Sequence, residues 1–295
     1  MSTVLGLDMG GSRTRALVVR DGETEAEAFG FGTNITALGS AEVGRRLAVV
    51  LTDLGHPNID ACCAGAAGSE QPRARAQLEA LLVEFLPGAR VEVVHDSRLV
   101  LAAANVASGV ALVAGTGSVA WGRTQTGEEV RAGGWGWLLG DDGGGAWVVR
   151  EAMRVVMRRA DDGMSAGPLG ASLLSATGTS DAVALAAALH LKAEPQEWAA
   201  LAGAVFRAGA ADQDALAIIE RAANSLADMA IRVAERLGNS GPIVLAGGLL
   251  LNQPLLESAV RARLHERGLR VHRLDVEPVV GAARLATQLL AAKLG

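Results

Sequence analysis

The chain has 295 residues, enough for two ordinary domains or one large one, and half of them are hydrophobic although only 3% are aromatic. Its 27 basic and 32 acidic residues give a net charge of −5 and form no basic tract, which argues against nucleic-acid and anionic-membrane partners and favours a small, diffusing one. Lysine occurs only at Lys192 and Lys293, neither in the context of a P-loop or a protein-kinase strand, so both of those phosphate-binding designs are excluded.

Three short strands are expected at the start of the chain. Residues 4–7, 15–20 and 24–31 are apolar or alternating runs, joined by turns at Asp8-Met9-Gly10-Gly11 and Asp21-Gly22. No helix follows the first glycines, so we predict an antiparallel meander. The N-terminus lacks a basic segment followed by a long apolar one, and no stretch of about 18 residues reads as a membrane span. We therefore expect a soluble, cytoplasmic protein.

Helices and strands then alternate. We predict helices at 41–54, 73–85 and 99–104 and strands at 59–66 and 91–94. The first of these strands contains Cys62 and Cys63, the only cysteines of the chain. Adjacent cysteines suit neither a disulfide nor a metal site, so we expect two buried thiols in a reducing compartment.

The opening pattern recurs at residue 110. Strands at 110–114, 119–122 and 129–132 are again joined by a glycine turn, Gly115-Thr116-Gly117-Ser118, and by a second turn at Thr126-Gly127. The two copies start roughly 105 residues apart, which indicates a duplicated core in which each copy opens one lobe. We therefore assign residues 1–108 to an N-terminal lobe and 109–295 to a C-terminal lobe, with the last helix, about 284–295, able to pack back on the first lobe.

Helices dominate the remaining chain. They are predicted at 147–159, 168–174, 181–191, 196–207, 213–237, 254–266 and 278–294, with strands at 243–246 and 269–272. Mixed strands and helices in this order predict an α/β fold with flanking helices around each sheet.

The segment from Asp8 to Thr14 carries the groups that a magnesium–phosphate ligand needs. A carboxylate at a strand end is followed by Gly10 and Gly11, whose missing Cβ atoms let backbone amides approach a ligand, and then by hydroxyls including Ser12. A plain hairpin turn is the alternative interpretation. A dinucleotide-binding fingerprint fits poorly, because a strand rather than a helix follows the glycines.

The turn Gly115-Thr116-Gly117-Ser118 stands at the same point of the second copy. Either turn alone is a weak signal for phosphate binding. Two glycine-hydroxyl hairpins from duplicated lobes could face each other across a cleft and hold one polyphosphate between them, so their repetition favours phosphate binding.

Residues 133–145 form the densest glycine stretch of the chain. Asp141 or Asp142 could cap the helix that follows, and we expect one of them to do no more than that. The backbone amides of the stretch could also receive a hydroxyl-rich ligand or an anion. Trp135 and Trp137 could form a wall on which a sugar stacks, although packing is the favoured interpretation.

Other polar residues follow predicted strands. His95 and Asp96 come after strand 91–94, at the carboxyl end where open α/β sheets bind their ligands. Asp96 could cap the next helix or accept a proton from an attacking hydroxyl, whereas His95 is interpreted as a packing or hydrogen-bonding histidine. Asn34 could cap its loop or bind hydroxyls, and Gly247-Gly248 could form a flat nucleoside surface or a tight turn.

Together these motifs resemble the sugar kinase and actin superfamily, and within it the BadF/BadG/BcrA/BcrD-type group that includes N-acetylglucosamine kinases. The resemblance runs nearly from end to end and rests on Leu5-Gly-Leu-Asp-Met-Gly-Gly-Ser-Arg-Thr14, Ala114-Gly-Thr-Gly-Ser118, Gly133-Gly-Trp-Gly-Trp-Leu-Leu-Gly-Asp-Asp-Gly143, Val244-Leu-Ala-Gly-Gly248 and Glu277-Pro-Val-Val-Gly-Ala-Ala283. It implies a two-lobed actin-like, ribonuclease H-like fold with a cleft, a sugar and phosphate side on the first lobe, a nucleotide side on the second, ATP and Mg²⁺ as cofactors, and a homodimer.

The resemblance also implies roles for single residues. Asp96 would take the proton of the sugar 6-hydroxyl, and Asp8 would hold Mg²⁺ mostly through water. Nucleotide contacts would come from Gly10, Gly11, Ser12, Thr14, Thr116, Gly117, Gly247 and Gly248. Sugar contacts would come from Asn34, Asp96, Gly115, Thr116, Asp141 and Gly145.

The implied activity is ATP-dependent phosphorylation of the 6-hydroxyl of N-acetylglucosamine or glucosamine. The amino sugar itself stays open, because Val119 and Asp142 stand where relatives carry a polar residue and a Glu. One alternative is an N-acetylmuramic acid kinase. Another is an ATPase that activates a dehydratase or reductase, although such relatives bind an iron–sulfur cluster through cysteines that one adjacent pair cannot replace in the usual way.

Overall fold

The computed structural model describes residues 2–239 and 241–292, which divide into two compact units. The first unit combines the chain up to Ala107 with the segment from Leu274 onward, and the second is Ser108–Arg273. The boundary near residue 108 agrees with the end of the first lobe expected from the sequence. The C-terminal segment differs, because it joins the first unit from Leu274 rather than from about residue 284.

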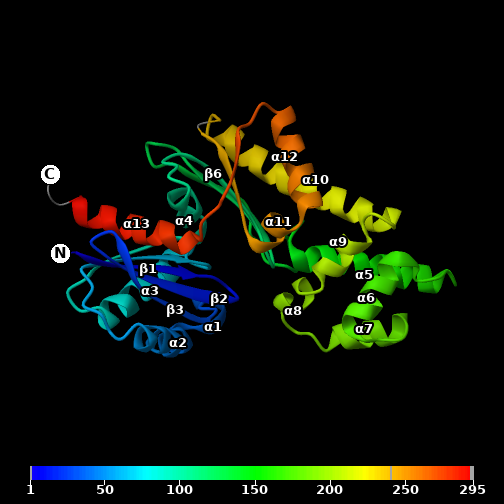
Figure 1. Cartoon of the computed structure of the whole chain (residues 1–295), viewed down its shortest axis with the longest axis horizontal. Helices are drawn as coiled ribbons and strands as arrows, with labels where there is room; N and C mark the ends of the chain where they lie inside the picture. Colours follow the sequence, from blue (N-terminus) through cyan, green and yellow to red (C-terminus); the bar gives the residue numbers. More distant parts are fainter. Residues whose placement is uncertain (1, 240, 293–295) are drawn as a thin grey trace. The chain divides into compact units, whose positions relative to one another are not determined.

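The first unit is built on a mixed sheet in which β1 lies at the centre (Figure 1). The strand order is β3-β2-β1-β4-β5, with β1 Thr3–Met9, β2 Arg13–Arg20, β3 Glu23–Phe31, β4 Ala61–Ala66 and β5 Arg90–His95. β1, β2 and β3 form the predicted antiparallel meander, and β4 and β5 run parallel to β1. Asp21 and Gly22 both adopt positive φ, the combination that a two-residue hairpin turn requires.

Helices cover both faces of this sheet. They are α1 Ile35–Leu38, α2 Ser40–Asp53, α3 Pro72–Phe85, α4 Asp96–Ala103 and α13 Pro278–Ala291. Because side chains alternate along a strand, Cys62 packs in the core on the α2 and α3 face, whereas Cys63 packs in the core on the α4 and α13 face. Both thiols are fully buried, as expected, and burial raises the pKa of Cys63 to about 12.

α13 is fixed to the first unit by very close backbone packing. A Cβ atom on Gly281 would lie 2.1 Å from the carbonyl oxygen of Leu99, and one on Gly6 would lie 2.5 Å from the amide nitrogen of Ala283. Arg284 donates to the carbonyls of Ala102 and Ala103, at 3.1 and 2.6 Å, and so satisfies the C-terminal end of α4. These contacts explain why the C-terminal segment belongs to the first unit. Residues 293–295 of the predicted last helix lie outside the described residues.

The second unit repeats the same sheet. Its strand order is β10-β9-β6-β7-β8, with β6 Gly109–Ala114, β7 Ser118–Arg123, β8 Glu129–Gly133, β9 Ile243–Ala246 and β10 Val271–Arg273. Read from the other edge, this order places an antiparallel meander beside two parallel strands, as in the first unit. The predicted α/β class and the duplicated core are therefore confirmed.

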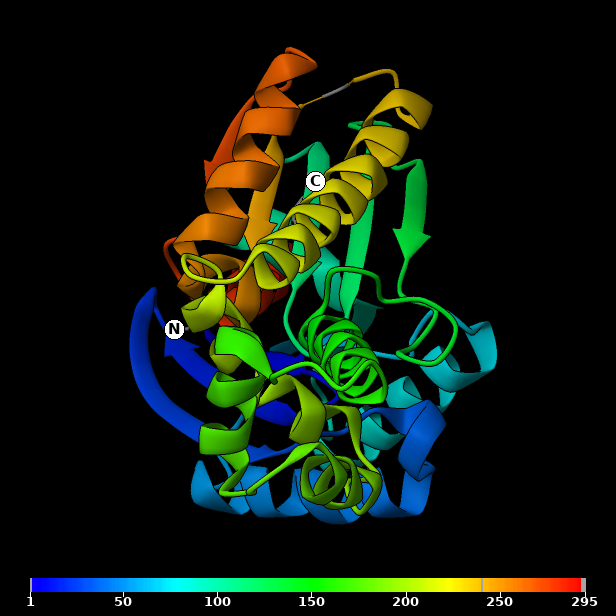
Figure 2. The same cartoon turned by 90° about the vertical axis from the view of Figure 1, so that its right-hand side faces the viewer.

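Helices make up most of the second unit. They are α5 Gly145–Asp161, α6 Gly167–Thr177, α7 Ala182–His190, α8 Pro195–Ala199, α9 Ala202–Ala208, α10 Gln213–Arg236, α11 Gly248–Asn252 and α12 Pro254–Glu266. α10 packs on β6, β7 and β8, and Figure 2 shows it side by side with α12. The helix predicted at 196–207 is two helices, α8 and α9, and the short helices α1 and α11 were not predicted.

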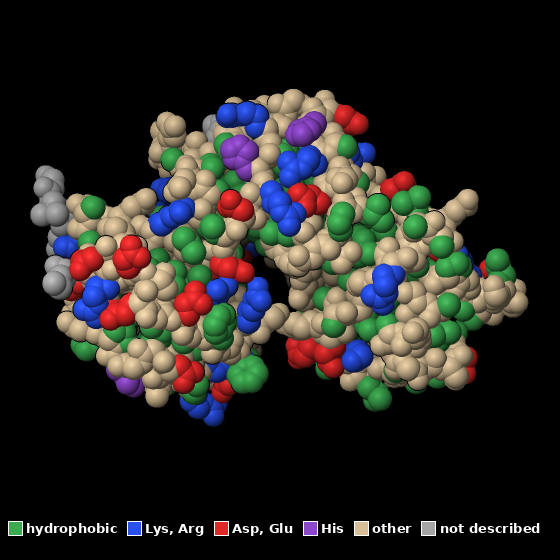
Figure 3. Space-filling view, viewed as in Figure 1, with side chains coloured by type: hydrophobic (Ala, Val, Ile, Leu, Met, Phe, Trp, Pro, Cys, Tyr) green, Lys and Arg blue, Asp and Glu red, His purple; other side chains and the backbone are tan. Residues whose placement is uncertain are grey.

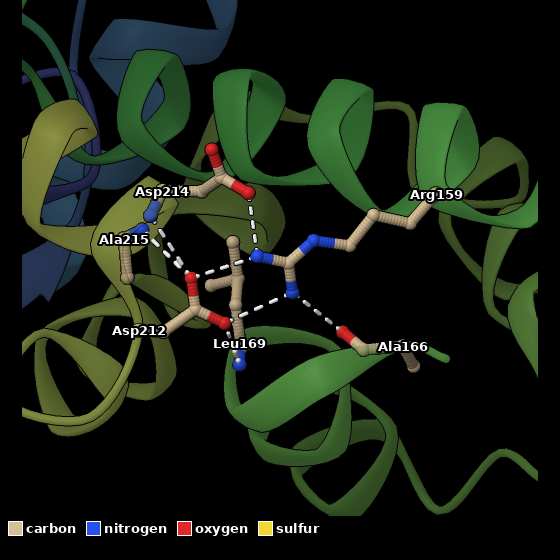
Figure 4. Close-up of polar contacts among 6 residues, drawn as sticks. All are labelled: Arg159, Ala166, Leu169, Asp212, Asp214 and Ala215. Carbon is tan, nitrogen blue, oxygen red and sulfur yellow. Dashed lines mark hydrogen bonds and ion pairs between the residues drawn. The ribbon is translucent and has the colours of Figure 1, made fainter. Parts of the chain in front are cut away.

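A buried ion pair joins three helices of the second unit (Figure 4). Asp212 caps α10 by accepting from the amides of Asp214 and Ala215, at 3.0 and 3.3 Å, and it also accepts from the amide of Leu169, at 3.0 Å. Both of its oxygens lie 2.9 Å from guanidinium nitrogens of Arg159 on α5. Burial alone would raise the pKa of Asp212, but Arg159 and these amides outweigh it and lower the pKa to about 2.

The surface of the first unit carries mixed charge. Figure 3 shows acidic and basic side chains interspersed over the face in view, consistent with a net charge of only −5. Within residues 2–239 and 241–292, no single helix is long and apolar enough to cross a membrane. Only α6 and α7 taken together would qualify, and they are bent by 51°.

Candidate active site

Two carboxylates lie at the carboxyl edge of the first sheet. Asp8 is in β1, opposite Gly65 of β4, and Asp96 directly follows β5 as the first residue of α4. Burial raises the pKa of Asp8 to about 7, and the negative charge of Asp96 adds to this increase while Arg13 opposes it. The two acids therefore interact electrostatically. Both lie at the edge of the sheet where α/β proteins bind their ligands.

Asp96 remains ionised although Asp8 is near. Burial pushes its pKa upward, but hydrogen bonding and charge from His95, together with donors from Ser97, outweigh burial and lower the pKa. His95, not Asp96, occupies the N-cap of α4, where its Nδ1 lies 3.2 Å from the amide nitrogen of Ser97. The interpretation of Asp96 as the cap is thus wrong, which leaves its carboxylate for chemistry.

His95 also contacts an acid that the sequence analysis missed. Its Nε2 lies 3.4 Å from Oε1 of Glu70, and its Nδ1 lies 3.0 Å from Oδ1 of Asp96. The signal for Glu70 was the polar segment directly after β4, which ends at the same edge of the sheet as β5. The interpretation of His95 as a buried, hydrogen-bonded histidine agrees with this arrangement.

The first glycine turn presents unused backbone donors. Gly10 donates to the carbonyl of Arg13 at 3.0 Å, and a Cβ atom on Gly32 would lie 2.0 Å from the carbonyl oxygen of Gly11, so β3 holds the turn tightly. Among the residues that the structure describes, the amides of Gly11 and Ser12 have no protein acceptor. Both residues are exposed, which suits contact with an anion.

Thr14 has a different place from the one expected. Its side chain is 1% exposed and its hydroxyl donates to the carbonyl of Phe31 at 2.9 Å, while its oxygen lies 2.6 Å from the hydroxyl oxygen of Thr33. The hydroxyl therefore points into the unit and fixes the turn. The role of Thr14 as a direct nucleotide contact is corrected to a supporting one.

Asn34 caps α1. Its Oδ1 accepts from the amides of Thr36 and Ala37, at 3.1 and 3.2 Å, and from the Thr36 hydroxyl at 2.6 Å. Gly68, in the turn after β4, packs so closely that a Cβ atom there would lie 2.6 Å from the same oxygen. The capping interpretation of Asn34 is thus confirmed for its oxygen, while the amide nitrogen is the group that remains for a ligand.

The second glycine turn lies against the start of α5. Carbonyls of Gly115 and Thr116 accept from the amides of Gly145 and Ala146, at 2.8 and 3.0 Å, which satisfies the first donors of the helix. The expectation that an acid caps this helix is wrong, because Gly144 is the N-cap and makes no side-chain cap bond. Elsewhere in the turn, the amides of Thr116 and Gly117 and the Thr116 hydroxyl have no partner among the described residues.

Asp141 is held in an unusual conformation beside this turn. It has a positive φ of 56°, and its Oδ1 accepts from the amide of Gly136 at 3.2 Å. A Cβ atom on Gly117 would lie 2.2 Å from the Asp141 carboxylate, so a larger residue there would have to displace that side chain. Burial raises the pKa of Asp141. Trp137 packs against Trp198, with ring centroids 6.0 Å apart, which agrees with its packing interpretation.

Gly247 brings β9 against the end of β6. It has a φ of +94°, and a Cβ atom on it would lie 2.3 Å from the carbonyl oxygen of Ala114. Gly248, the first residue of α11, is exposed, and a Cβ atom on it would have only the side chain of Asn252 nearby, at 3.8 Å. The tight turn is confirmed, whereas the nucleoside surface stays a prediction.

The arrangement suits a cation that keeps most of its water. No group of three or more His, Cys, Asp or Glu side chains that could hold a metal occurs within residues 2–239 and 241–292. Mg²⁺ commonly binds one or two carboxylates together with substrate phosphates and water. Asp8, with its raised pKa and with open amides in the adjoining turn, fits such an ion better than it fits a metal held by protein alone.

Comparison with known proteins shows the family of the chain. The model of the BadF/BadG/BcrA/BcrD ATPase family matches residues 5–286. An N-acetylmuramic acid/N-acetylglucosamine kinase of Clostridium acetobutylicum is 29% identical over 169 residues, which is 55% of this chain and 55% of that protein. The alignment with this relative thus spans about half of its length.

Two further relatives match over almost the whole chain. An N-acetyl-D-glucosamine kinase of Dictyostelium discoideum is 25% identical over 308 residues, covering 96% of this chain and 97% of that protein. The crystal structure of a candidate N-acetylglucosamine kinase from Chromobacterium violaceum has a TM-score of 0.78 at 25% identity and covers 97% and 99% of the two chains. The chain belongs to the BadF/BadG/BcrA/BcrD ATPase family.

Proposed function

We propose that the protein is an ATP-dependent amino-sugar kinase that transfers the γ-phosphate to the 6-hydroxyl of N-acetylglucosamine or glucosamine. The observation that carries this proposal is the pairing of an ionised Asp96 with open glycine-turn amides near Asp8, because one supplies a base and the other an anion site. The names of the relatives from Clostridium and Dictyostelium support the same substrate class.

Asp96 acts as the base in this proposal. Its carboxylate accepts the proton of the sugar hydroxyl as the hydroxyl oxygen attacks the γ-phosphorus, and the bond from that phosphorus to the bridging oxygen of ADP breaks. Such a transfer needs little covalent help from the protein, so positioning and charge neutralisation supply most of the rate. The lowered pKa of Asp96 keeps it ready to accept a proton at neutral pH.

The two glycine turns contact the phosphates of ATP. In the first unit the amides of Gly11 and Ser12 donate, and Gly10 fixes the turn because its own amide donates to the carbonyl of Arg13. In the second unit Thr116, through its hydroxyl and amide, and Gly117 meet the γ-phosphate, while Gly247 and Gly248 form the surface for the nucleoside. Mg²⁺ would lie near Asp8, mostly through water, and when bound it neutralises phosphate charge.

The sugar contacts are proposed for side-chain and backbone groups, residue by residue. We assign hydrogen bonds with sugar hydroxyls to Asn34 through its amide nitrogen, to Asp96, and to the carboxylate of Asp141. Gly115 and Gly145 contribute backbone surface rather than donors, because the amides of both already bond within the second unit.

An N-acetylmuramic acid kinase remains the second candidate, because the Clostridium relative carries that activity in its name. An ATPase activator with an iron–sulfur cluster is disfavoured by geometry. Cys62 and Cys63 are both buried and point to opposite faces of β4, so the pair cannot ligate one cluster together. We further propose that the protein lies in the cytoplasm, where ATP is available, and that it forms a homodimer. Light scattering after gel filtration tests the dimer.

The test is ADP release with Mg-ATP and a panel of glucosamine, N-acetylglucosamine, N-acetylmuramic acid, N-acetylmannosamine and glucose, with a no-sugar control. Strong stimulation by one amino sugar is the expected result and identifies the substrate. Sugar-independent hydrolysis, or no turnover with any sugar, contradicts the kinase assignment and favours an activator of a protein partner.

A further inference from the structure

We propose that His95 is a positioning residue which, with Glu70 behind it, holds Asp96 as an oriented carboxylate for proton transfer. This inference rests on the proposed function of Asp96. Its new members are His95 and Glu70, to which no contact with ATP, sugar or Mg²⁺ has been assigned. The imidazole bridges two carboxylates, with Nδ1 3.0 Å from Oδ1 of Asp96 and Nε2 3.4 Å from Oε1 of Glu70.

His95 and Asp96 are consecutive in the chain, whereas Glu70 comes from another segment, so the contact of Glu70 with His95 is a tertiary feature. Glu70 lies in the segment between β4 and α3, His95 ends β5, and Asp96 starts α4. The imidazole is 7% exposed, whereas the side chains of Glu70 and Asp96 are 35% and 32% exposed. A buried imidazole whose two ring nitrogens each face a carboxylate has a fixed orientation, as in other histidine–carboxylate pairs.

Protonation of the imidazole gives this bridge its electrostatic effect. Burial lowers the pKa of His95, but Asp96 and Glu70 outweigh burial and raise it to about 9. The imidazolium in turn lowers the pKa of Glu70. It also lowers the pKa of Asp96, against the effect of burial.

The hydrogen bonds around Nδ1 define two alternatives that can be told apart. A protonated Nδ1 donates to Asp96, which leaves the second carboxylate oxygen for the sugar hydroxyl. A neutral Nδ1 would instead accept from the amide of Ser97, which lies 3.2 Å away, and would only cap α4. The first alternative makes His95 a positioning residue, and the second makes it purely structural.

Histidine NMR on the whole protein separates these alternatives without any assay of activity. The chain has five histidines, and the signal that disappears in His95→Asn identifies His95, while the exposed His56, His190, His265 and His272 serve as references. We expect the His95 ring to stay protonated at both nitrogens at pH 8 and to lose a proton at lower pH in Glu70→Gln. Titration of the His95 ring near the ordinary value of about 6.5 would overturn the proposal.

Kinetic measurements supply the second test of this proposal. His95→Ala is expected to lower kcat roughly 10- to 100-fold with the KM for ATP nearly unchanged, as for other partners that orient a reacting group. His95→Asn, which keeps a donor toward Asp96, should recover part of this loss. Both variants should move the acid limb of the kcat profile to higher pH, because an Asp96 without the imidazolium binds its proton more tightly.

The controls separate failure of the bridge from failure of the proposed function. His272→Asn, an exposed change in the second unit, should leave kcat and the pH profile unchanged. If the His95 variants yield less folded protein, but the folded fraction shows no shift of the acid limb, the positioning role is refuted. If the wild-type protein phosphorylates no sugar, the proposed function fails, and the NMR titration still decides whether the Glu70–His95–Asp96 bridge exists.

Discussion

Asp8 and Asp96 have the same side-chain chemistry but opposite pKa shifts. Burial and a neighbouring negative charge dominate at Asp8, whose pKa rises to about 7. At Asp96 the contacts with His95 and Ser97 outweigh burial, and the pKa falls. This separation of the two pKa values is consistent with the roles proposed above, Asp96 as the base and Asp8 as the cation contact.

The base assignment predicts a specific kinetic defect. Asp96→Asn should lower kcat at least about 100-fold, because an amide cannot accept the sugar proton, while ATP binding measured by calorimetry should stay near normal. Asp53→Asn, an exposed change at the end of α2, is the matched control. Near-normal turnover of Asp96→Asn would remove Asp96 from the role of base.

The raised pKa of Asp8 predicts that the ionised side chain lowers the stability of the folded protein. Its pKa of about 7 in the folded state lies above the unfolded value of 3.8, so the folded state retains this proton more strongly and stability falls as pH rises from about 4 to 7. Asp8→Asn stays neutral and should unfold with a free energy roughly 1 to 3 kcal/mol higher at pH 8 without Mg²⁺.

Urea unfolding at two pH values checks this prediction. The advantage of Asp8→Asn should be present at pH 8 and should disappear near pH 4, and the variant should lose Mg²⁺-dependent turnover. Equal stability of both proteins at pH 8 would show that Asp8 carries no such electrostatic cost.

At the scale of single elements, α13 depends on glycine at its contact with α4. A Cβ atom on Gly281 would collide with backbone of Leu99 and Ala103, at 2.1 and 2.7 Å, and backbone cannot rotate away as a side chain can. Gly281→Ala should therefore cost at least about 2 kcal/mol of unfolding free energy, by overpacking. Gly203→Ala in α9 would meet only the movable guanidinium of Arg207, at 3.4 Å, and should be neutral or slightly stabilising. Similar losses in both variants would contradict this explanation.

The capping ion pair of α10 offers a second matched comparison. Asp212 is 6% exposed and joins α5, α6 and α10 through Arg159 and the amide of Leu169, whereas the side chain of Asp214 is 50% exposed and contacts the same arginine. Asp212→Ala should cost roughly 3 to 5 kcal/mol, because it leaves Arg159 and buried amides unpaired, and Asp214→Ala should cost under about 1 kcal/mol.

The pH dependence of this pair has a definite sign. The folded pKa of about 2 lies below the unfolded value of 3.8, so the stabilisation is complete above about pH 4 and is lost as pH falls toward 2. Thermal unfolding of the wild type and of Asp212→Ala should therefore converge in that window. A constant difference between them from pH 5 to pH 2 would contradict the ion-pair account.

Strand and helix periodicity predicted the elements well, and the reason is local. Alternating and apolar runs are determined by short stretches of sequence, so both meanders and most helices appear where expected. The short helices α1 and α11 have too few residues to show a period. The cap of α5 could not be predicted, because carbonyls of Gly115 and Thr116, some 30 residues earlier in the chain, satisfy its first amides.

At the scale of the whole molecule, the duplicated sheet contains the same strand–glycine turn–strand arrangement twice. Each copy starts with a strand, a glycine turn and a second strand, and each turn carries amides without a protein acceptor among the described residues. Sequence repetition predicted the turns, and the position of Asp96 directly after a predicted strand predicted the acid at the carboxyl edge of β5. It did not predict Glu70, since the contact of Glu70 with His95 depends on tertiary structure, nor the buried orientation of Thr14.

One measurement tests the central claim most directly, namely phosphorus NMR of the protein with Mg-ATP and N-acetylglucosamine. The account predicts that ATP is converted to ADP and to one phosphate monoester whose phosphorus couples to the two protons on carbon 6 of the sugar, with no matching release of inorganic phosphate. Inorganic phosphate formed at the rate of ADP, or a phosphate coupled to another carbon, would contradict the assignment of this protein as an amino-sugar 6-kinase.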